Sequence, residues 1–402
     1  MPAIEIKPDV YWIGINDRTT DLFEGLWPIA QAGVSYNSYF IDDEKKAIID
    51  LTKAIKGDEF IAQIDELTDI TKIDYIIINH MEPDHSGLLR TLLRIAPDVT
   101  IFGSEKTKEM LKAFYSITDN VKAIKDGDTL SLGRRTLKFI STPFVHWPET
   151  IMTYDMDQNI LFSGDAFGGY GALRGAIFDD ECRDFEFYKK ESLRYYVNIV
   201  ANFSVRVLSA IDKLKDFKVD IIAPSHGLIW RKEPELIISL YKKWAEYASG
   251  KTEPGVTLIY GSMYGNTEVV MNAVAHGISQ TGVPFEIFDA ARTHSSYILP
   301  SLWTKQGVMI GAPTYEVSLF PPVSDVLKMA VHKHIKNKKA AYFGSYGWSG
   351  GALRGLKNIV EPLKWDLLDV FEFVGCPSSG DIKKAEAFGR NFAEQLKIKS
   401  VL

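Results

Sequence analysis

The chain has 402 residues, 46% of them hydrophobic and 24% charged, a composition typical of a globular protein that excludes a wholly disordered one. At about 150 residues per domain, this length predicts two or three domains. Lysines and arginines total 46 against 52 aspartates and glutamates, and the formal net charge of -6 argues against a nucleic-acid partner. The two cysteines, Cys182 and Cys376, cannot build a disulfide scaffold, a rubredoxin site or an iron–sulfur cluster within the chain, and we expect both to be structural.

The chain carries no sign of a targeting or membrane-spanning segment. Residues 1–15 include Glu5, Lys7 and Asp9 and lack the apolar core of a signal peptide. No apolar run approaches the roughly 18 residues of a membrane-spanning helix. We therefore expect a soluble, cytoplasmic protein with no membrane partner.

Short strand-like runs dominate the first 250 residues, and a helical pattern closes them. Apolar and β-branched residues predict strands at 35–41, 46–50, 74–79, 137–140, 151–154, 159–162 and 219–223. Residues 86–95 and 236–247 have helical periodicity. The small and helix-breaking residues of 248–255 then predict a domain boundary, with one domain over 1–250 and a second over 251–402.

Strands and helices alternate strictly in the second domain. Strands are predicted at 256–260, 284–289, 307–311 and 340–343, and helices at about 266–281, 319–331, 350–363 and 383–397. This alternation implies a parallel sheet covered on both faces, a doubly wound α/β fold. The basic run 333–339 falls between a helix and a strand. We interpret it as a solvated connection rather than as a docking patch for an acidic carrier.

Histidines and carboxylates gather beyond the strands of the first domain. The segment 79–87 reads Asn-His-Met-Glu-Pro-Asp-His-Ser-Gly, with four ionisable groups within six residues. Groups packed so closely at a strand end would repel one another or stay unsatisfied without a cation between them. A lone histidine is more often structural, but all four histidines of this domain follow strands, which favours a metal site. The candidate ligands are His80, Glu82, Asp84, His85, His146, Asp165 and His226.

The number and type of these ligands indicate the kind of metal. Six or seven side chains are too many for one tetrahedral ion and suit two ions bridged by a carboxylate. Carboxylates in place of imidazoles, with no thiolate, shift the preference from zinc toward iron or manganese.

Three loops of the second domain predict a flavin site. The loop 261–267, Gly-Ser-Met-Tyr-Gly-Asn-Thr, joins a strand to a helix, and its hydroxyls and backbone N–H groups can cradle a phosphate. It lacks the lysine of a nucleotide P-loop and the Gly-x-Gly-x-x-Gly of a dinucleotide fold, so the terminal phosphate of FMN fits better. The loops 311–315 and 344–351 add glycines and aromatic rings that can lie against an isoalloxazine ring. The alternative for all three is an ordinary surface loop. The candidate cofactor-binding residues are Ser262, Met263, Tyr264, Gly265, Asn266, Thr267, Pro313, Thr314, Tyr315, Ser345, Tyr346, Gly347, Trp348, Ser349 and Gly350.

The motifs together resemble a known family. His-x-Glu-x-Asp-His over 80–85 is similar to the metallo-β-lactamase signature His-x-His-x-Asp-His with its second histidine exchanged for Glu82. With His-Trp-Pro at 146–148, Asp165, Ser-His-Gly at 225–227 and the three flavodoxin-like loops, the chain resembles the flavodiiron proteins from end to end. The resemblance implies an N-terminal metallo-β-lactamase-like αββα sandwich, a C-terminal flavodoxin-like domain, FMN and a diiron centre.

The resemblance also implies how the ligands divide and what the protein does. One iron would take His80, Glu82 and His146, the other Asp84, His85 and His226, with Asp165 bridging; some relatives leave the histidine at the His85 position off the metal. The implied activity is reduction of dioxygen to water and/or nitric oxide to nitrous oxide, with no catalytic residue beyond the metal ligands. Electrons would pass from a separate donor, such as rubredoxin or a reduced deazaflavin, through FMN to the irons. A head-to-tail homodimer, or a dimer of dimers, would set the flavin of one chain beside the irons of another.

Departures from the family pattern leave the substrate open. Phe23-Glu24-Gly25-Leu26 stands where many relatives have Phe-His-Gly-Tyr, whose His and Tyr approach the gas-binding side, and Gly164 stands where relatives often have Asn. The preference between dioxygen and nitric oxide is therefore not inherited. Two other functions stay open from the residues: a zinc-dependent hydrolase fused to a flavodoxin-like electron-transfer module, and an electron carrier with a vestigial metal domain.

Overall fold

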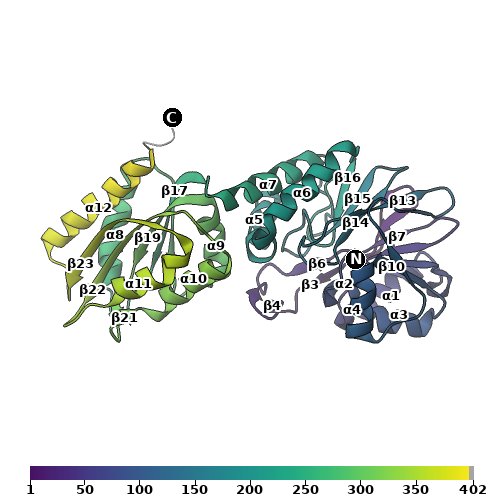
Figure 1. Ribbon diagram of the computed structural model, residues 1–402, viewed down its shortest axis with the longest axis horizontal. Helices are drawn as coiled ribbons and strands as arrows, with labels where there is room; N and C mark the ends of the chain where they lie inside the picture. The colour runs from purple at the N-terminus through teal and green to yellow at the C-terminus, as the bar shows by residue number, and fades with distance from the viewer. Residues whose placement is uncertain (398–402) are drawn as a thin grey trace. The chain divides into compact units, whose positions relative to one another are not determined.

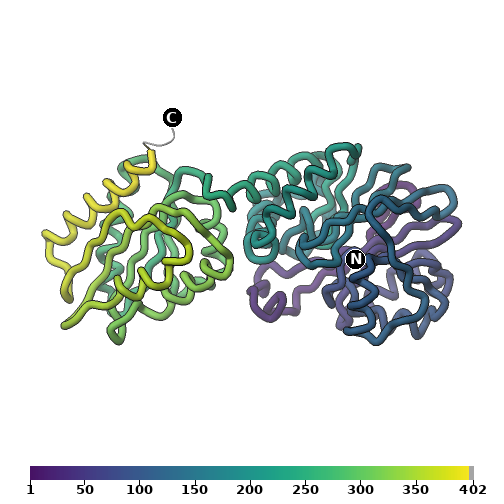
Figure 2. Tube along the Cα trace, in the orientation of Figure 1, coloured from purple at the N-terminus to yellow at the C-terminus, as the bar shows by residue number. Residues whose placement is uncertain are grey.

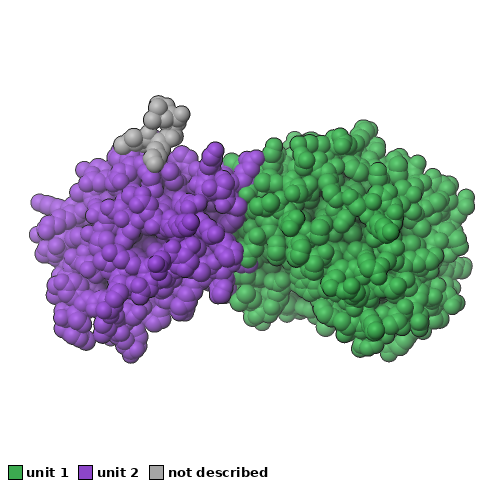
Figure 3. Space-filling model, viewed as in Figure 1, with its two compact units in different colours: residues 1–245 green, residues 246–402 purple. Residues whose placement is uncertain are grey.

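The computed structural model describes residues 1–397 and divides the chain into two compact units, Met1–Ala245 and Glu246–Leu402 (Figure 3). The purple, blue and teal parts of the trace build the first unit, and the green and yellow parts build the second (Figure 2). Within the described residues, every helix is too short or too polar to cross a lipid bilayer.

Two facing sheets form the centre of the first unit. The first sheet has the strand order β1-β2-β7-β8-β9-β10-β11 and the second the order β12-β13-β14-β15-β16. The strands of the first are β1 (Ile4–Lys7), β2 (Val10–Trp12), β7 (Tyr39–Ile41), β8 (Ala47–Ile49), β9 (Tyr75–Ile77), β10 (Thr100–Ser104) and β11 (Val121–Ile124). Those of the second are β12 (Thr129–Ser131), β13 (Thr136–Ser141), β14 (Ile151–Asp155), β15 (Ile160–Gly164) and β16 (Ile221–Pro224). Two small ribbons, β3 (Ile15–Asp17) with β6 (Val34–Tyr36) and β4 (Leu22–Phe23) with β5 (Trp27–Pro28), accompany them.

Alternation along the strands sorts the apolar side chains into layers. Ile49 packs with Phe162 between the two sheets, whereas its neighbour Ile48 packs with Phe60 and Leu89 of the helices outside the first sheet. The helices are α1 (Gly57–Asp65), α2 (Pro83–Ser86), α3 (Leu89–Ile95), α4 (Glu105–Tyr115), α5 (Phe185–Tyr195), α6 (Ser204–Lys213) and α7 (Pro234–Glu246). Helices thus cover two central sheets (Figure 1), which confirms the expected αββα sandwich.

Two of the predicted elements are divided. The expected strand 35–41 is β6 and β7, which belong to different sheets, because side-chain hydrogen bonds turn the chain between them. Asn37 donates from its amide to the carbonyl oxygens of Pro224 and Gly227, both at 2.9 Å, and the Ser38 hydroxyl donates to Asp50 O at 2.6 Å. The expected helix 86–95 is divided as well, because Ser86 is the last residue of α2 and α3 begins only at Leu89.

One parallel sheet forms the second unit, in the order β18-β17-β19-β22-β23. Its strands are β17 (Glu253–Tyr260), β18 (Phe285–Asp289), β19 (Lys305–Gly311), β22 (Lys339–Tyr346) and β23 (Asp366–Val374); β20 (Thr314–Tyr315) and β21 (Ser318–Leu319) form a hairpin beside it. The helices are α8 (Asn266–Ser279), α9 (Ser295–Thr304), α10 (Pro321–His332), α11 (Ala352–Val360) and α12 (Ser379–Lys397). Numbered along this unit, the order 2-1-3-4-5 is the flavodoxin-like one, which confirms the expected fold.

Several observed elements were not predicted. They include β10 and α4 in the first unit and, in the second, α9, which contains Pro300, and β23, which has a charged residue at every third position and does not read as a buried strand. The run 333–339 does connect a helix to a strand, but Lys338 is buried rather than solvated. Cys182 is half-buried against the core, whereas Cys376 is exposed and does not pack in a core.

Candidate metal centre and cofactor pocket

The ends of neighbouring strands bring the predicted metal ligands together. Asp165 follows β15 directly and His226 lies two residues beyond β16, the parallel strand beside it. Ser225 N donates to Gly164 O at 2.8 Å, so the two strand ends stay in register. The remaining ligands come from the segment after β9 and from the connection between β13 and β14.

Asn79 joins the two sheets next to the ligand segment. Its backbone N–H donates to Asp50 Oδ1 at 2.8 Å, and its backbone oxygen accepts from Ile151 N at 3.0 Å. Its side-chain oxygen accepts from the Thr153 hydroxyl at 2.7 Å. Asn79, Asp50 and Thr153 are all buried. These bonds fix the start of the segment that carries His80.

The first ligand group surrounds one carboxylate oxygen of Asp165. Asp165 Oδ2 lies 3.0 Å from His146 Nε2 and 3.5 Å from His80 Nε2. Glu82 Oε2 lies 3.2 Å from His146 Nε2 and 3.3 Å from His80 Nε2. One oxygen or nitrogen from each of these four residues lies within 4.8 Å of the others, close enough to surround one cation.

The second ligand group surrounds the other oxygen of Asp165. Asp165 Oδ1 lies 3.0 Å from His85 Nε2 and 3.4 Å from His226 Nε2. Asp84 Oδ1 lies 3.4 Å from His85 Nε2, and Asp84 Oδ2 lies 3.4 Å from His226 Nε2. The structure therefore brings all seven predicted ligands together, in the two groups that the sequence analysis expected, with Asp165 between them.

The chemistry of these atoms fits a pair of cations. Among the described residues, both carboxylate oxygens of Asp84 and Asp165 and the Nε2 atoms of His85 and His226 are buried without a hydrogen-bond partner. Burial alone would lower the pKa of His226, but Asp165 and Asp84 raise it to about 10. Asp165 and Glu82 likewise raise the pKa of His146 to about 9 against the effect of burial. The buried carboxylates therefore favour positive charge beside them. Two divalent cations would supply that charge while the imidazoles stay unprotonated.

Residues that the sequence analysis missed hold the ligand rings. His80 Nδ1 lies 2.7 Å from Glu149 Oε1, and His226 Nδ1 donates to the backbone oxygen of Ser35 at 2.7 Å. Such contacts fix which ring nitrogen faces the metal. The position of Glu149 just after His-Trp-Pro was a weak signal; nothing in the sequence pointed to Ser35 or to Asp50.

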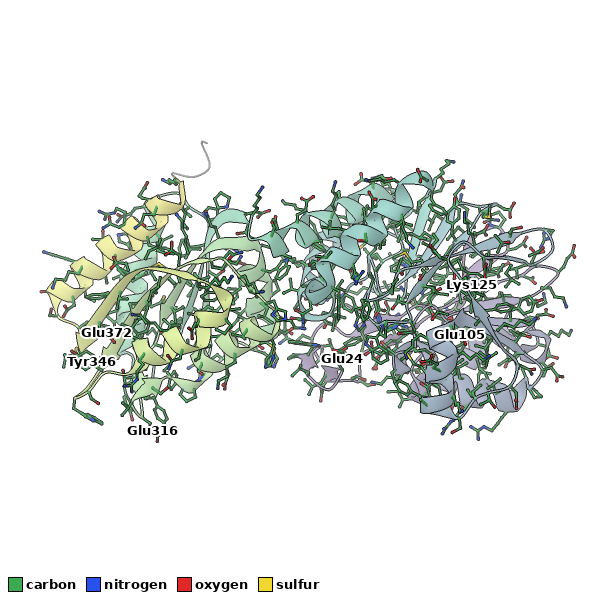
Figure 4. All side chains as sticks on the ribbon, in the orientation of Figure 1. Glu24, Glu105, Lys125, Glu316, Tyr346 and Glu372 are labelled. Atoms are coloured by element: carbon green, nitrogen blue, oxygen red, sulfur yellow. The ribbon has the colours of Figure 1, made fainter. Side chains whose placement is uncertain are left out.

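The hairpin of β4 and β5 lies against the metal ligands. The Phe23 ring meets the His226 ring edge-on, with centroids 5.5 Å apart. Glu24, labelled in Figure 4, belongs to this hairpin. It has a left-handed backbone (φ 51°) and accepts a 3.0 Å hydrogen bond from Trp27 Nε1. Burial and the charge of Glu82 raise the pKa of Glu24 to about 7. The stretch that departs from the family pattern therefore faces the centre.

A pocket of about 450 Å³ lies at the ends of the parallel strands in the second unit. Its lining is Met263, Tyr264, Asn266, Pro313, Thr314, Tyr315, Glu316, Val317, Ser345, Tyr346, Gly347, Trp348, Ser349 and Gly375. Glu316, Val317 and Gly375 were not predicted. Four predicted residues do not line it: Ser262, Gly265, Thr267 and Gly350. Figure 4 shows Glu316 and Tyr346 at this end of the unit.

Local bonds shape the loops around this pocket. Gly265, with a left-handed φ of 89°, precedes α8, and its N–H donates to the Ser262 hydroxyl at 3.0 Å. The hydroxyls of Thr267 and Ser345 meet at 3.2 Å and link the first loop to the third. The rings of Tyr264 and Trp348 are 89% and 96% exposed, which leaves them free to cover a planar ligand.

Comparison with known proteins assigns both units. Residues 34–227 match the model of the ODP family beta lactamase, and residues 258–389 match the flavodoxin model. The first range contains every predicted metal ligand, and the second contains every predicted flavin-loop residue.

Similar proteins match along the whole chain. The nitric oxide reductase of Moorella thermoacetica is 32% identical, over 98% of both chains. The rubredoxin oxygen:oxidoreductase of Desulfovibrio gigas has a TM-score of 0.93 at 28% identity and covers 100% of both chains. The flavodiiron protein of Giardia intestinalis has a TM-score of 0.92 at 29% identity, over 99% of this chain and 97% of that one. A match of this extent joins both units in one family, and the chain belongs to the flavodiiron proteins.

Proposed function

We propose that the protein reduces dioxygen to water, nitric oxide to nitrous oxide, or both, with FMN and a diiron centre. The observation that carries this proposal is the division of seven buried ligands around the two oxygens of Asp165. The similar proteins named for nitric oxide reduction and for rubredoxin–oxygen oxidoreduction support the same substrates. The family assignment favours this function over the zinc hydrolase and the electron carrier.

The assignment of the ligands follows the two groups. His80, Glu82 and His146 would hold one iron, Asp84, His85 and His226 the other, and Asp165 would bridge them. Glu82 puts a hard, anionic oxygen where an imidazole would favour zinc. When bound, the iron pair supplies two electrons to a small gas molecule. Glu149 and the backbone of Ser35 orient the imidazoles of His80 and His226, and the surrounding fold keeps the seven ligands buried.

The three loops of the second unit would hold FMN. Thr267 lies in the first turn of α8 and Ser262 in the loop before it, beside the residues that line the pocket, and hydroxyls and N–H groups at a helix start suit a phosphate. Tyr264, Tyr346 and Trp348 offer aromatic faces for the isoalloxazine ring. When bound, the flavin supplies single-electron transfer.

An external donor and a second chain complete the proposal. Rubredoxin or a reduced deazaflavin is the proposed donor, and the proposed location is the cytoplasm. The flavin loops and the metal ligands belong to different units, and the short segment 247–252 between α7 and β17 is no long tether. A head-to-tail homodimer, alone or paired into a dimer of dimers, would therefore bring one chain's flavin to the other chain's irons.

The first test measures cofactors and turnover together. The protein is purified without oxygen, its iron, zinc and FMN are quantified, and consumption of each gas is followed with reduced rubredoxin as donor. We expect two irons and one FMN per chain and consumption of at least one gas. Two zinc ions with no gas consumption would overturn the proposal.

The second test asks whether catalysis crosses between chains. We expect a Ser262→Ala, Thr267→Ala double variant to lack FMN and an Asp165→Ala variant to lack iron. Heterodimers formed by subunit exchange should regain activity that neither parent has, because one intact flavin then faces one intact iron pair. An active monomer in light scattering, or no recovery after proven exchange, would contradict the dimer.

A further inference from the structure

The two cation sites differ in what supports their histidines. A carboxylate, Glu149, backs His80 at 2.7 Å from its Nδ1 atom. A neutral backbone oxygen, that of Ser35, backs His226 at the same distance. His85 Nδ1 is buried without a hydrogen-bond partner among the described residues. Among the described residues, a carboxylate that is not itself a predicted ligand contacts an imidazole only in the first ligand group.

Glu149 is held rigidly for this contact. Its Oε1 atom also accepts from Met81 N at 2.8 Å, next to His80 in the chain. Its own backbone oxygen accepts from the Ser104 hydroxyl at 2.9 Å. The side chain is 1% exposed, so water does not screen its charge. The His80 ring is thereby fixed with Nε2 toward Asp165.

A further buried carboxylate near the ligand segment, that of Asp50, does not take the same part as Glu149. Asp50 accepts hydrogen bonds from Asn79 N at 2.8 Å and from the Ser225 hydroxyl at 3.4 Å, and among the described residues it makes no hydrogen bond or ion pair with an imidazole. Negative charge near the first site stabilises a cation there, and a more highly charged cation most of all.

We propose that Glu149 is a positioning residue of the metal centre that makes its two sites unequal. Through His80, it tightens cation binding at the His80–Glu82–His146 site and lowers the reduction potential of the iron there relative to the iron at the Asp84–His85–His226 site. The proposal rests on the assignment of the ligands, not on which gas is reduced. Outer carboxylates of this kind typically change metal affinity by about 10- to 100-fold.

Glu149→Gln separates charge from geometry. Glutamine keeps an oxygen that can accept from His80 Nδ1 and Met81 N but removes the negative charge. In the iron-loaded protein, competition with a chelator should then release one of the two irons about tenfold faster or more, while the other is unchanged. Stepwise reduction followed by Mössbauer spectroscopy should show the two irons reduced at closer potentials than in the wild type.

Two further variants make the outcome decisive. Glu149→Ala also removes the hydrogen bond and should lose the same iron faster still; if this variant fails to fold, the glutamine variant decides. Glu105→Gln, an exposed glutamate of α4, is the matched control and should change neither measurement. Equal release of both irons, or unchanged release and potentials in a folded Glu149→Gln protein, would overturn the proposal. These readouts do not use gas consumption, so they stand apart from a failure of the proposed function.

Discussion

Asp165 Oδ2 lies 3.0 Å from His146 Nε2, and the other oxygen of the same carboxylate turns to a separate set of ligands. Asp165 is 1% exposed and follows β15, whose pairing with β16 fixes the backbone on both sides. One short side chain at a strand end thus contacts both ligand groups. The proposed bridge between the two irons depends on this single residue.

Asp165→Ala should remove both irons. Each ligand group loses the Asp165 oxygen that faces it, and the remaining ligands then provide less negative charge to hold a cation. Iron and zinc per chain are measured after anaerobic purification, and circular dichroism checks the fold. Asp98→Ala, at an exposed site of the same unit, should keep both irons. Two metal ions in a folded Asp165→Ala protein would rule out the bridge.

Glu82→His should shift metal content from iron toward zinc, because an imidazole replaces a hard, anionic oxygen that lies 3.2 Å from His146 Nε2 and 3.3 Å from His80 Nε2. Reduction of both gases should be lost. Elemental analysis of protein grown with equal iron and zinc checks the change. Unchanged iron content with full activity would show that Glu82 does not set the metal.

Glu24→His should change the ratio of dioxygen to nitric oxide consumption severalfold, because it puts an imidazole in place of a carboxyl group whose pKa the nearby charge of Glu82 raises. Glu24→Gln serves as the control for charge alone. Both rates are measured with one donor at one pH. A constant ratio in both variants would mean that this hairpin does not influence the choice of gas.

Gly351→Ala should weaken FMN binding by roughly tenfold, about 1.4 kcal/mol. A Cβ at this position would lie 2.2 Å from Val317 O, so the β20–β21 hairpin that lines the pocket must move. Gly350→Ala, where a Cβ would meet open space, is the neighbouring control. Fluorescence titration of the apoprotein with FMN gives both affinities; equal values would show that the hairpin does not position the flavin.

Lys338 should make stability depend on pH. Burial lowers its pKa from 10.5 to about 7, while its Nζ atom donates to the backbone oxygens of Trp303 and Lys305. Between these two values the unfolded chain binds more protons than the folded one, so the free energy of unfolding rises with pH across this window. Lys338→Met should flatten this rise relative to the wild type.

Denaturant unfolding at pH 7, 8.5 and 10 measures the difference between wild type and variant, in which effects common to both cancel. Lys336→Met, at an exposed position of the same connection, should keep the wild-type slope. A variant slope equal to that of the wild type would mean that Lys338 stays charged in the fold.

The sequence by itself determined which residues gather at the centre and which loops surround the cofactor pocket. Both depend on local patterns: a carboxylate- and histidine-rich segment after one strand, and glycine-rich loops after parallel strands. Because strand ends meet at one edge of a sheet, such local signals suffice to place side chains together. The exchange of histidine for Glu82 was visible in the same way.

Only the tertiary structure decided how these residues are supported. Glu149 reaches His80 across 69 positions of the chain, and Ser35 reaches His226 across 191. The strand expected over 35–41 breaks because Asn37 bonds to residues nearly 190 positions away. Hydrogen bonds between residues so far apart in the chain depend on how the two sheets pack, and they cannot be predicted from the pattern within one segment. The sequence therefore predicts the ligands, and the fold supplies the different partners of their imidazoles.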